Sequence, residues 1–382
     1  MSHDDAGVCS KDEAGHGKAG VLIRRGRRED EPFIREFTRD TFEWGDYVGD
    51  AFPEWLDEPG EVFVAEFCGR PVGVTHVFYL SSSEAWFEGI RIHPALRRKG
   101  IGSLLSRASI DAARTHGCRI ARCAIDSLNT ASSELARRLG FRLTAKLREF
   151  TRSLTWASLS EELGDEQGAD GSGPEWGPAI LVRQAREDEL SFILSKAVNG
   201  ARYLGVDFRW RALSTEGIRG VITSGNLLVA TDTRGAVTAG ALFSRVWEEQ
   251  TSSGRVSIEI ETSPVFGSQA GFKALFRHAV FLLRQKALLC GPNRDAAASR
   301  PGSGVPEGAR PEDPSGIGNA PADEKGPAGL TFKIHSFCED LSPVQLILLD
   351  LGFRPETPCY QELPGPQSTC RDFDVGLWEL DL

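Results

Sequence analysis

The sequence predicts two α/β domains of the same fold, each with a mixed sheet, arranged in tandem. Three observations favour this. Between residues 21 and 154, strand-like apolar segments alternate with segments of helical periodicity, in the order β-α-α-β-β-β-α-β-α-β. Two short stretches of sequence occur twice, in the same order. A strand-like run also leads directly into a helix through the glycine pattern G-x-G, which is a place to hold a phosphate.

Length, charge and cysteine content exclude several classes of protein. A chain of 382 residues is too long for one ordinary core, so about two domains are expected. A formal net charge of -10 argues against nucleic acid or an anionic membrane as the main partner. The eight cysteines include no C-x-x-C pair, so we expect no metal site, no disulfide framework and a reducing cytoplasm. No apolar run approaches the roughly 20 residues needed to span a bilayer.

The first half of the chain accounts for one domain. We expect it at residues 19–156, after a disordered tail at 1–18. Its predicted strands are 21–25, 61–67, 72–80, 85–93, 119–125 and 141–154, and its predicted helices are 30–42, 51–56, 103–116 and 130–139.

Two segments lack the apolar periodicity of a folded element. Residues 157–177 are acidic and glycine-rich, which predicts a linker. Residues 291–329 are rich in proline, glycine and alanine, which predicts a disordered insertion. The second domain would then occupy residues 178–382, with this insertion inside it.

The second domain repeats landmarks of the first. The stretch from Leu22 to Glu31 recurs in similar form from Leu181 to Glu189, and Leu-Gly-Phe-Arg occurs at 139–142 and again at 351–354. Matched landmarks in the same order indicate a duplicated fold. Between them, strands are expected at 227–231, 238–246, 256–262 and 331–337, and helices at 268–286 and 343–351.

The junction after the strand at 85–93 is suited to an anion. Gly100 and Gly102 remove the Cβ atoms that would keep a phosphate from the backbone. The helix that follows, from Ser103 to His116, directs its free N–H groups and its positive dipole end at the same place. We therefore expect a pyrophosphate to bind here.

This junction belongs to a longer motif. The pattern I-x-I-x-P-x-x-R-R-K-G-I-G begins at Ile90, and Asn129 and the Leu-Gly-Phe ending at 139–141 follow it. With these residues, positions 21–155 resemble the GCN5-related N-acetyltransferases (GNAT). The resemblance implies an acyltransferase that uses acetyl-CoA as a co-substrate, and a sheet that splays open to admit it.

The resemblance also implies which residues bind acetyl-CoA. The pyrophosphate would lie on a loop formed by Arg97, Arg98, Lys99, Gly100, Ile101, Gly102 and Ser103. Backbone groups of Ile92 and His93 would face the acetyl and pantetheine arm. Asn129 would contact the pantetheine arm, although an ordinary helix N-cap explains an asparagine there at least as well.

Glu88 is the candidate general base. Strand alternation places it on one face with Ile90 and Ile92, so an acid would interrupt an otherwise apolar face near the acetyl group. A lysine-like amine of pKa about 10.4 is neutral in on the order of one part per thousand at pH 7, so it needs a base. An α-amine of pKa about 8 needs less help. The alternative is that Glu88 forms a structural salt bridge or hydrogen bond.

One position departs from the family pattern. Many members have a tyrosine four residues before the Gly of the Gly-Phe ending, where it protonates the departing thiolate, and this chain has Ala136. For a thiol of pKa about 8.5, departure as a free thiolate at pH 7 costs roughly 2 kcal/mol, so the reaction would be slowed but not abolished. Tyr79, Ser132 or Ser133 would be substitutes.

The second domain departs much further. When Pro264 is matched to the proline of the first motif, Ala270 and Phe272 replace the two loop glycines, and the phenylalanine would block a phosphate. The same match replaces Glu88 by Ile258. We therefore expect a degenerate GNAT fold that shapes the acceptor side of the first domain or supports a dimer-like arrangement.

Two histidines of the second domain, His278 and His335, are expected to serve packing rather than catalysis. Neither has a carboxylate or a cysteine at ligand spacing in the sequence. One acetyl-CoA per chain is the resulting expectation.

The segment from Asp40 to Glu61 bears on the acceptor. It contains eight acids, no lysine or arginine, and interleaved aromatic residues, which favours a cationic amine. The alternative is a solvated acidic face whose aromatic residues pack into the core. The acceptor would be a small-molecule or peptide amine, with an amino acid, a polyamine, an aminoglycoside-like compound and a protein N-terminus all open. The protein would act as a monomer or homodimer.

Two functions other than acetyl transfer are open. One is a non-catalytic module that binds or senses acyl-CoA, which Ala136 and the degenerate half favour. The other is an interaction scaffold that binds no cofactor, in which case acetyl-CoA would leave the melting temperature unchanged.

Overall fold

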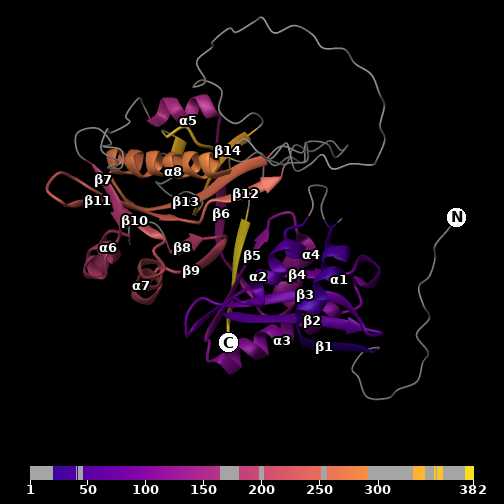
Figure 1. Ribbon diagram of the computed structural model, residues 1–382. Coiled ribbons are helices and arrows are strands. Elements are labelled where there is room, and N and C mark those ends of the chain that lie inside the picture. The colour runs from indigo at the N-terminus through magenta and orange to yellow at the C-terminus, as the bar shows by residue number, and fades with distance from the viewer. Residues whose placement is uncertain are drawn as a thin grey trace, which may run out of the picture. The chain divides into compact units, whose positions relative to one another are not determined.

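A computed structural model describes most of the chain (Figure 1). The described residues are 20–39, 41, 46–163, 180–197, 202–250, 256–290, 330–339, 348–349, 351–355 and 375–382. The predicted tail at 1–18, the linker from 164 onward and the insertion at 291–329 lie outside them. The chain forms two compact units. Unit 1 comprises residues 1–148, 208–212 and 364–382, and unit 2 comprises residues 149–207 and 213–363.

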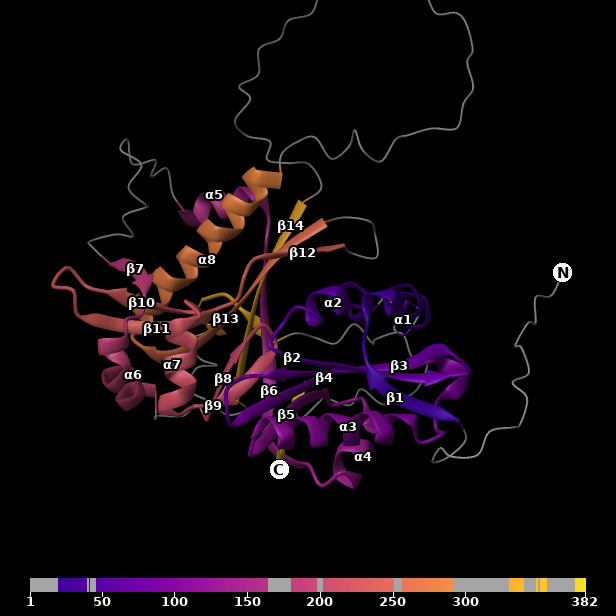
Figure 2. The same ribbon diagram turned by 60° about the horizontal axis from the view of Figure 1, so that its bottom comes forward.

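Unit 1 is a mixed sheet with helices on both faces. Its strands are β1 (Val21–Arg25), β2 (Gly60–Phe67), β3 (Arg70–Tyr79), β4 (Glu84–Ile92), β5 (Ile120–Asp126), β6 (Arg142–Leu154) and β16 (Val375–Asp381). They lie in the order β1-β2-β3-β4-β5-β16-β6. Its helices are α1 (Glu31–Thr38), α2 (Val48–Trp55), α3 (Ile101–His116) and α4 (Thr130–Arg138). Figure 2 shows α1 and α2 on one face of this sheet and α3 on the other.

Unit 2 repeats this plan. Its strands are β7 (Leu181–Gln184), β8 (Tyr203–Val206), β10 (Leu227–Thr231), β11 (Val237–Phe243), β12 (Trp247–Gln250), β13 (Val256–Gly267), β14 (Leu330–Glu339) and β15 (Arg354–Pro355). Its helices are α5 (Trp156–Leu163), α6 (Leu190–Ala197), α7 (Thr215–Thr223) and α8 (Gln269–Cys290). From β7 to β14, and apart from the added strands β8 and β12, the order of the described elements follows that of unit 1. The predicted tandem of two α/β domains is confirmed. Among the described residues, no helix combines the length and apolar character that crossing a membrane requires.

The two units exchange segments, so their bounds differ from the predicted 19–156 and 178–382. The last strand of the chain, β16, belongs to unit 1, where it lies between β5 and β6 and pairs antiparallel with both. Residues 208–212, which carry strand β9 (Arg209–Ala212), also belong to unit 1. In return, residues 149–163 belong to unit 2. Each unit therefore needs chain from the other half of the sequence.

Side chains reinforce the insertion of β16. Trp378 is buried with Phe141 and Ala136 in one apolar cluster. Glu379 accepts a hydrogen bond of 2.7 Å from Nε of Arg122, a buried residue of β5. Because Arg122 is almost fully enclosed, removing Glu379 would leave a buried charge less well compensated.

The repeated landmark has a physical basis. In unit 1, Arg24 bonds the carboxylate of Asp30, which also accepts the backbone N–H of Arg27 at 2.8 Å. In unit 2, Arg183 bonds Glu189, which accepts the backbone N–H of Arg186 at 2.8 Å. Each first strand is thus tied to the helix that follows, which explains why this arginine and acid recur six residues apart.

The linker prediction is wrong for residues 157–163. They form helix α5, and Leu159 and Leu163 are buried in the core of unit 2. These two leucines lie four residues apart, on one face of the helix. Thr155 and Ser158 cap its start by reciprocal side-chain to backbone hydrogen bonds.

His335, which is expected to serve packing, has beside it two acids that are distant in sequence. Its Nδ1 is 2.6 Å from Glu149 of β6, and its Nε2 is 2.6 Å from Glu259 of β13. Burial lowers the pKa of His335, but the hydrogen bonds to these carboxylates outweigh it and raise the pKa to about 9. Burial raises the pKa of Glu259, but His335 outweighs it and holds this pKa below its usual value. An ion-paired imidazolium therefore lies inside unit 2.

We predict that replacing Trp378 destabilises unit 1. Trp378→Ala should cost about 3 to 5 kcal/mol, since the indole is 6% exposed and its loss leaves a large cavity. Urea unfolding measures the loss, and hydrogen exchange should become faster in β5 more than in β10. The control Phe192→Ala, at a residue 40% exposed, should cost far less. Faster exchange mainly in β10 after Trp378→Ala would contradict the placement of β16.

We also predict that the stability of unit 2 falls as pH rises from about 6.5 to about 9. The raised pKa of His335 adds stability that is complete below its unfolded value of about 6.5 and is lost as pH passes about 9. The lowered pKa of Glu259 acts oppositely, so stability is also lost in acid. The alkaline loss should be about 3 kcal/mol and is measured by urea unfolding at stepped pH.

His335→Gln should remove most of this alkaline dependence. The matched variant is His278→Gln, because burial lowers the pKa of His278 and its charge plays no part above neutral pH. His278→Gln should retain the alkaline loss. An equal pH dependence in both variants would rule out the His335 ion pairs as its origin.

Candidate functional site

The sheet of unit 1 is open between β4 and β5. These parallel strands pair at Glu84–Ile120, Ala85–Ala121 and Trp86–Arg122, and the ladder then stops. Both strands continue, β4 to Ile92 and β5 to Asp126, and β5 stays paired with β16 along its full length. Backbone groups of β4 that face β5 beyond Trp86 therefore have no partner in that strand. This agrees with the splayed sheet that the resemblance implied.

A bulge at Gly89 accompanies the opening. Gly89 has a φ of +66°, and the pairing of β3 with β4 shifts register between Val74 and His76. A Cβ atom on Gly89 would lie 2.1 Å from the ring of Trp55 on α2. Both the backbone conformation and the close approach of Trp55 therefore require glycine at this position.

The bulge overturns the predicted face of Glu88. Ile90 and Ile92 pack with Leu105 of α3, on one side of the sheet. Glu88 lies on the other side, with His76, which stacks on Trp55 at 4.9 Å between ring centroids. Strand alternation predicted a shared face for Glu88 and the two isoleucines, but the extra residue of the bulge reverses the alternation at that point.

The start of α3 has the features of an anion site. Gly100 precedes the helix with a φ of +85°, provides no side-chain cap, and has no atom within 4 Å of the place where its Cβ would be. The first N–H groups of a helix have no partner inside it, so those following Gly100 are available to a ligand. The three cationic side chains before it, Arg97, Arg98 and Lys99, are exposed. These residues fit the pyrophosphate of acetyl-CoA.

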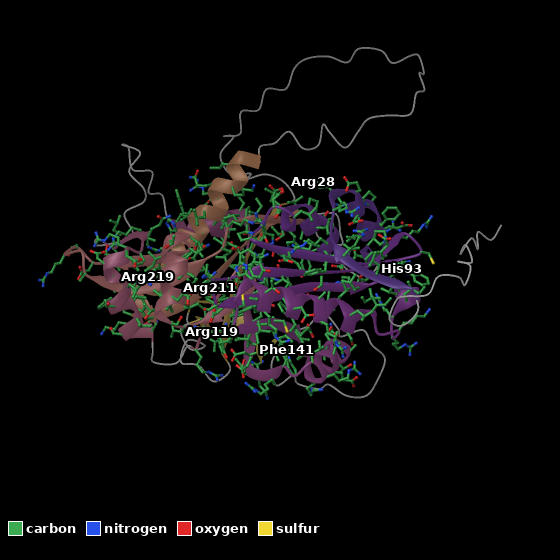
Figure 3. All side chains as sticks on the ribbon, turned by 90° about the horizontal axis from the view of Figure 1, so that it is seen from below. Arg28, His93, Arg119, Phe141, Arg211 and Arg219 are labelled. Carbon is green, nitrogen blue, oxygen red and sulfur yellow. The ribbon has the colours of Figure 1, made fainter. Side chains whose placement is uncertain are left out.

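Ile92, His93 and Asn129 differ in which of their hydrogen-bonding groups are available to a ligand. The N–H of His93, a residue labelled in Figure 3, donates to Val72, and its carbonyl accepts from Leu96. Since alternate residues of a strand bond to opposite neighbours, Ile92 directs its N–H to the open side. The carboxamide oxygen of Asn129 accepts the N–H of Ser132 at 3.0 Å, so Asn129 is the N-cap of α4.

Glu88 is the centre of a hydrogen-bonded cluster. Its Oε1 lies 2.9 Å from Nδ1 of His76 and 2.6 Å from Nη2 of Arg209, and its Oε2 accepts from Nε1 of Trp86 at 3.1 Å. Nη2 of Arg209 also bonds Glu58 at 2.7 Å. Arg209 lies on β9, so this cluster includes a residue that follows Glu88 by 121 positions.

The cluster keeps Glu88 ionised. Burial raises the pKa of Glu88, but the hydrogen bond from His76 and the charge of Arg209 outweigh burial and hold the pKa below its usual value. Ligand atoms of Glu58, His76 and Glu88 lie within 4.8 Å of one another, a spacing that would suit a metal ion. The guanidinium of Arg209 already supplies a positive charge to both carboxylates there.

The acids that predicted a cationic acceptor are paired with arginines. Among the described residues the ion pairs are Asp46–Arg91, Asp50–Arg35, Asp57–Arg28, Glu58–Arg209 and Glu61–Arg25. Phe52 and Trp55 are buried in the core, whereas Tyr47 is 54% exposed. Asp40, Phe42, Glu43 and Trp44 lie outside the described residues. The described part of this segment is therefore much closer to electrical neutrality than its own sequence indicates.

The proposed substitutes for the missing tyrosine differ in suitability. Ala136 is 5% exposed and packs in the cluster that contains Trp378. Tyr79 donates its O–H to Glu61 at 2.9 Å, and burial together with this bond raises its pKa. Tyr79 is therefore a poor proton donor at neutral pH. Ser132 and Ser133 lie on α4 and are half-buried.

Unit 2 lacks the phosphate loop, and its register differs from the predicted match. His76 pairs with Glu88 three residues after Gly73, and in unit 2 Phe243 pairs with Thr262 three residues after Gly240. Thr262, rather than Ile258, therefore stands in the place of Glu88.

The same register places the predicted proline match inside a strand. Pro264 pairs with Ala241 in the middle of β13 and does not begin a loop. Ile92 and Phe266 are then equivalent, yet nine positions separate Ile92 from the start of α3 and only three separate Phe266 from the start of α8. The loop that would hold a pyrophosphate is absent between β13 and α8 of unit 2. Its absence argues against a phosphate site there more strongly than the predicted block of a phosphate by Phe272.

Comparison with known proteins identifies the family of unit 1. Residues 29–141 match the family model described as Acetyltransferase (GNAT) family. The chain contains a GNAT acetyltransferase domain. No curated protein sequence matches the chain at a significant level.

The chain is similar to several solved structures. A GCN5-related glucosamine N-acetyltransferase region of a fungal β-N-acetylglucosaminidase is 11% identical, with a TM-score of 0.51, over 97% of this chain and 39% of that one. A GCN5-related N-acetyltransferase from Sphaerobacter thermophilus is 13% identical, with a TM-score of 0.49, over 94% of this chain and 95% of that one. A tandem GNAT protein from the clavulanic acid biosynthesis pathway is 13% identical, with a TM-score of 0.48, over 94% and 98%.

Sequence reasoning found the glycine loop and Glu88 but missed the partners of Glu88. His76 is the single histidine in the largely apolar sequence of β3, and no pattern around it predicts a contact with Glu88. Arg209 lies in the other half of the chain, and no local signal predicts that it joins unit 1.

Proposed function

We propose that the protein transfers the acetyl group of acetyl-CoA to a primary amine, by direct attack of the amine on the thioester. The observation that carries this proposal is the opening between β4 and β5 beside the uncapped start of α3. Together they offer one place for an anion and, next to it, strand backbone without a strand partner. Membership of unit 1 in the GNAT acetyltransferase family supports acyl transfer in general.

Different chemical groups of the proposed cofactor site would bind different parts of acetyl-CoA. Backbone N–H groups of Ile101, Gly102 and Ser103 would bind the pyrophosphate, with Arg97 and Lys99 adding positive charge. The N–H of Ile92 faces the open side of β4 and would orient the acyl arm. Bound acetyl-CoA would supply the activated acyl group, and this chain would supply the orientation.

The contacts of Glu88 bear on proton transfer. Glu88 has two candidate roles, as a general base and as a partner in a salt bridge. Its bonds to Arg209 support the salt bridge. The thiolate would leave without help from position 136, because Ala136 has no proton to give.

A module that binds acyl-CoA without catalysis is the second candidate function. Ala136 favours it, since the usual proton donor is missing. Release of free thiol separates the two candidates: a catalyst releases CoA thiol when an amine is present, whereas a sensing module binds acetyl-CoA and releases none.

We predict that Gly102→Leu prevents acetyl-CoA from binding. A Cβ at position 102 would lie 3.4 Å from Leu135 and 3.8 Å from Ile90. A leucine would therefore fill space beside the part of β4 that has no partner in β5, so affinity should fall by about a hundredfold or more. Binding is measured by calorimetry, and catalysis by thiol release over a panel of amines. The control is Ala270→Leu, at the second residue of α8 in unit 2, which should leave both unchanged.

Two outcomes would overturn the proposal. Unaltered acetyl-CoA binding in Gly102→Leu would exclude the start of α3 as the cofactor site. Tight binding in the wild type with no thiol release from any amine would leave the non-catalytic module as the function.

A further inference from the structure

Arg209 lies where β4 and β5 part. Strand β9, which carries it, contacts both of them. The next residue, Trp210, is 3% exposed and packs against Trp86, with 5.7 Å between ring centroids. Trp86 is the last residue of β4 that pairs with β5. A segment from the second half of the chain is thus packed against the point where β4 and β5 separate.

The side chain of Arg209 is held on three sides. Its Cζ lies 4.0 Å above the ring of Phe78, and its Nη2 bonds both Glu58 and Glu88. Its Nε lies 3.2 Å and 3.3 Å from the two oxygens of Glu88. The side chain is 15% exposed, so these contacts are largely shielded from water.

These contacts leave the carboxylate of Glu88 without a vacant acceptor site. An ionised carboxylate offers about four lone-pair sites. Oε1 accepts from His76 and from both nitrogens of Arg209, and Oε2 accepts from Trp86 and from Nε of Arg209. A substrate ammonium group would have to displace one of these donors before Glu88 could take its proton.

The neighbours of Glu88 do not offer an easy substitute. The ring of His76 is fully buried, so its Nε2 is out of reach of a substrate. Glu58 is held by the same guanidinium. Among the described residues, the other charged or titratable groups that face this cluster are Tyr47, Asp46 and Arg91, and the last two form an ion pair. At the loop side, Nδ1 of His93 accepts the N–H of Ala95.

We propose that Arg209 is a positioning residue that withholds Glu88 from proton transfer, and that the acceptor is therefore an amine already substantially neutral near pH 7, such as the α-amine of an amino-acid derivative or peptide. This inference rests on the proposed acetyl transfer. It also gives the second half of the chain a definite part in the first unit's chemistry.

The expected preference is large. An α-amine of pKa about 8 is roughly one-tenth neutral at pH 7, whereas a lysine ε-amine of pKa about 10.4 is neutral in fewer than about one part per thousand. A working general base would reduce this disadvantage, since such bases contribute about a hundredfold or more. Without one, the difference in neutral fraction appears directly in kcat/KM.

Two isomers provide a matched comparison. The amide of Nε-acetyl-lysine has a free α-amine, and the amide of Nα-acetyl-lysine has a free ε-amine, so the two share composition and nearly the same size. We expect the wild-type kcat/KM at pH 7 to be more than about a hundredfold higher for the α-amine isomer. Equal rates, or a preference for the ε-amine isomer, would overturn the inference.

Variants then test the role of Arg209. Arg209→Ala should free Glu88, so the preference for the α-amine isomer should shrink about tenfold, and millimolar guanidinium should restore it. The control is Arg219→Ala, which removes an exposed arginine that pairs with Glu187, and it should leave the preference unchanged. A preference that stays the same in Arg209→Ala while the melting temperature is retained would contradict the positioning role.

Glu88→Gln keeps the test decisive if Arg209→Ala does not fold. Glutamine retains the shape of the side chain but cannot act as a base, so kcat/KM for the α-amine isomer should stay within about threefold of the wild-type value at each pH between about 6 and 9. A loss of about a hundredfold would show that Glu88 takes the proton and would overturn the inference. Absence of thiol release from every amine is a different outcome, because it removes the proposed acetyl transfer itself.

Discussion

The bulge at Gly89 is the constraint on which the site of unit 1 depends. It lies where β4 parts from β5, and it turns Glu88 away from the isoleucines that follow it. Trp55 fills the space beside Gly89, so the bulge is fixed from the α2 side as well as by its own backbone. One residue with a positive φ thus both opens the sheet and directs an acid to the face opposite α3.

The two units share a plan but differ where a cofactor would bind. Unit 1 inserts a loop between β4 and α3, whereas β13 of unit 2 runs almost directly into α8. Unit 2 instead buries an ion-paired histidine, His335, within its sheet. The exchange of β16 and of residues 149–163 ties the folding of each unit to the other half of the chain. The second half of the sequence therefore contributes to unit 1 through residues 208–212 and the strand β16.

Local patterns in the sequence predicted the fold class, most strands and helices, and the glycine loop. They succeeded because period-two and helical patterns, and glycines that need a special backbone, are local properties. They failed where contacts join distant residues. The partners of Glu88 and of His335 are set by the tertiary fold, and an alternation rule cannot anticipate the extra residue of a bulge. The apolar face of α5 consists of few residues, Leu159 and Leu163 among them, so the sequence around it resembles a linker.

We propose that only unit 1 holds acetyl-CoA, because, within the part of the chain that the structure describes, only unit 1 combines the open pair β4 and β5 with an uncapped helix start behind a loop. Titration calorimetry of acetyl-CoA into the intact chain tests this claim most directly through its stoichiometry. We predict one acetyl-CoA per chain. A stoichiometry of two would show that unit 2 binds the cofactor without the loop, and a stoichiometry of zero would show that the opening in unit 1 is not a cofactor site.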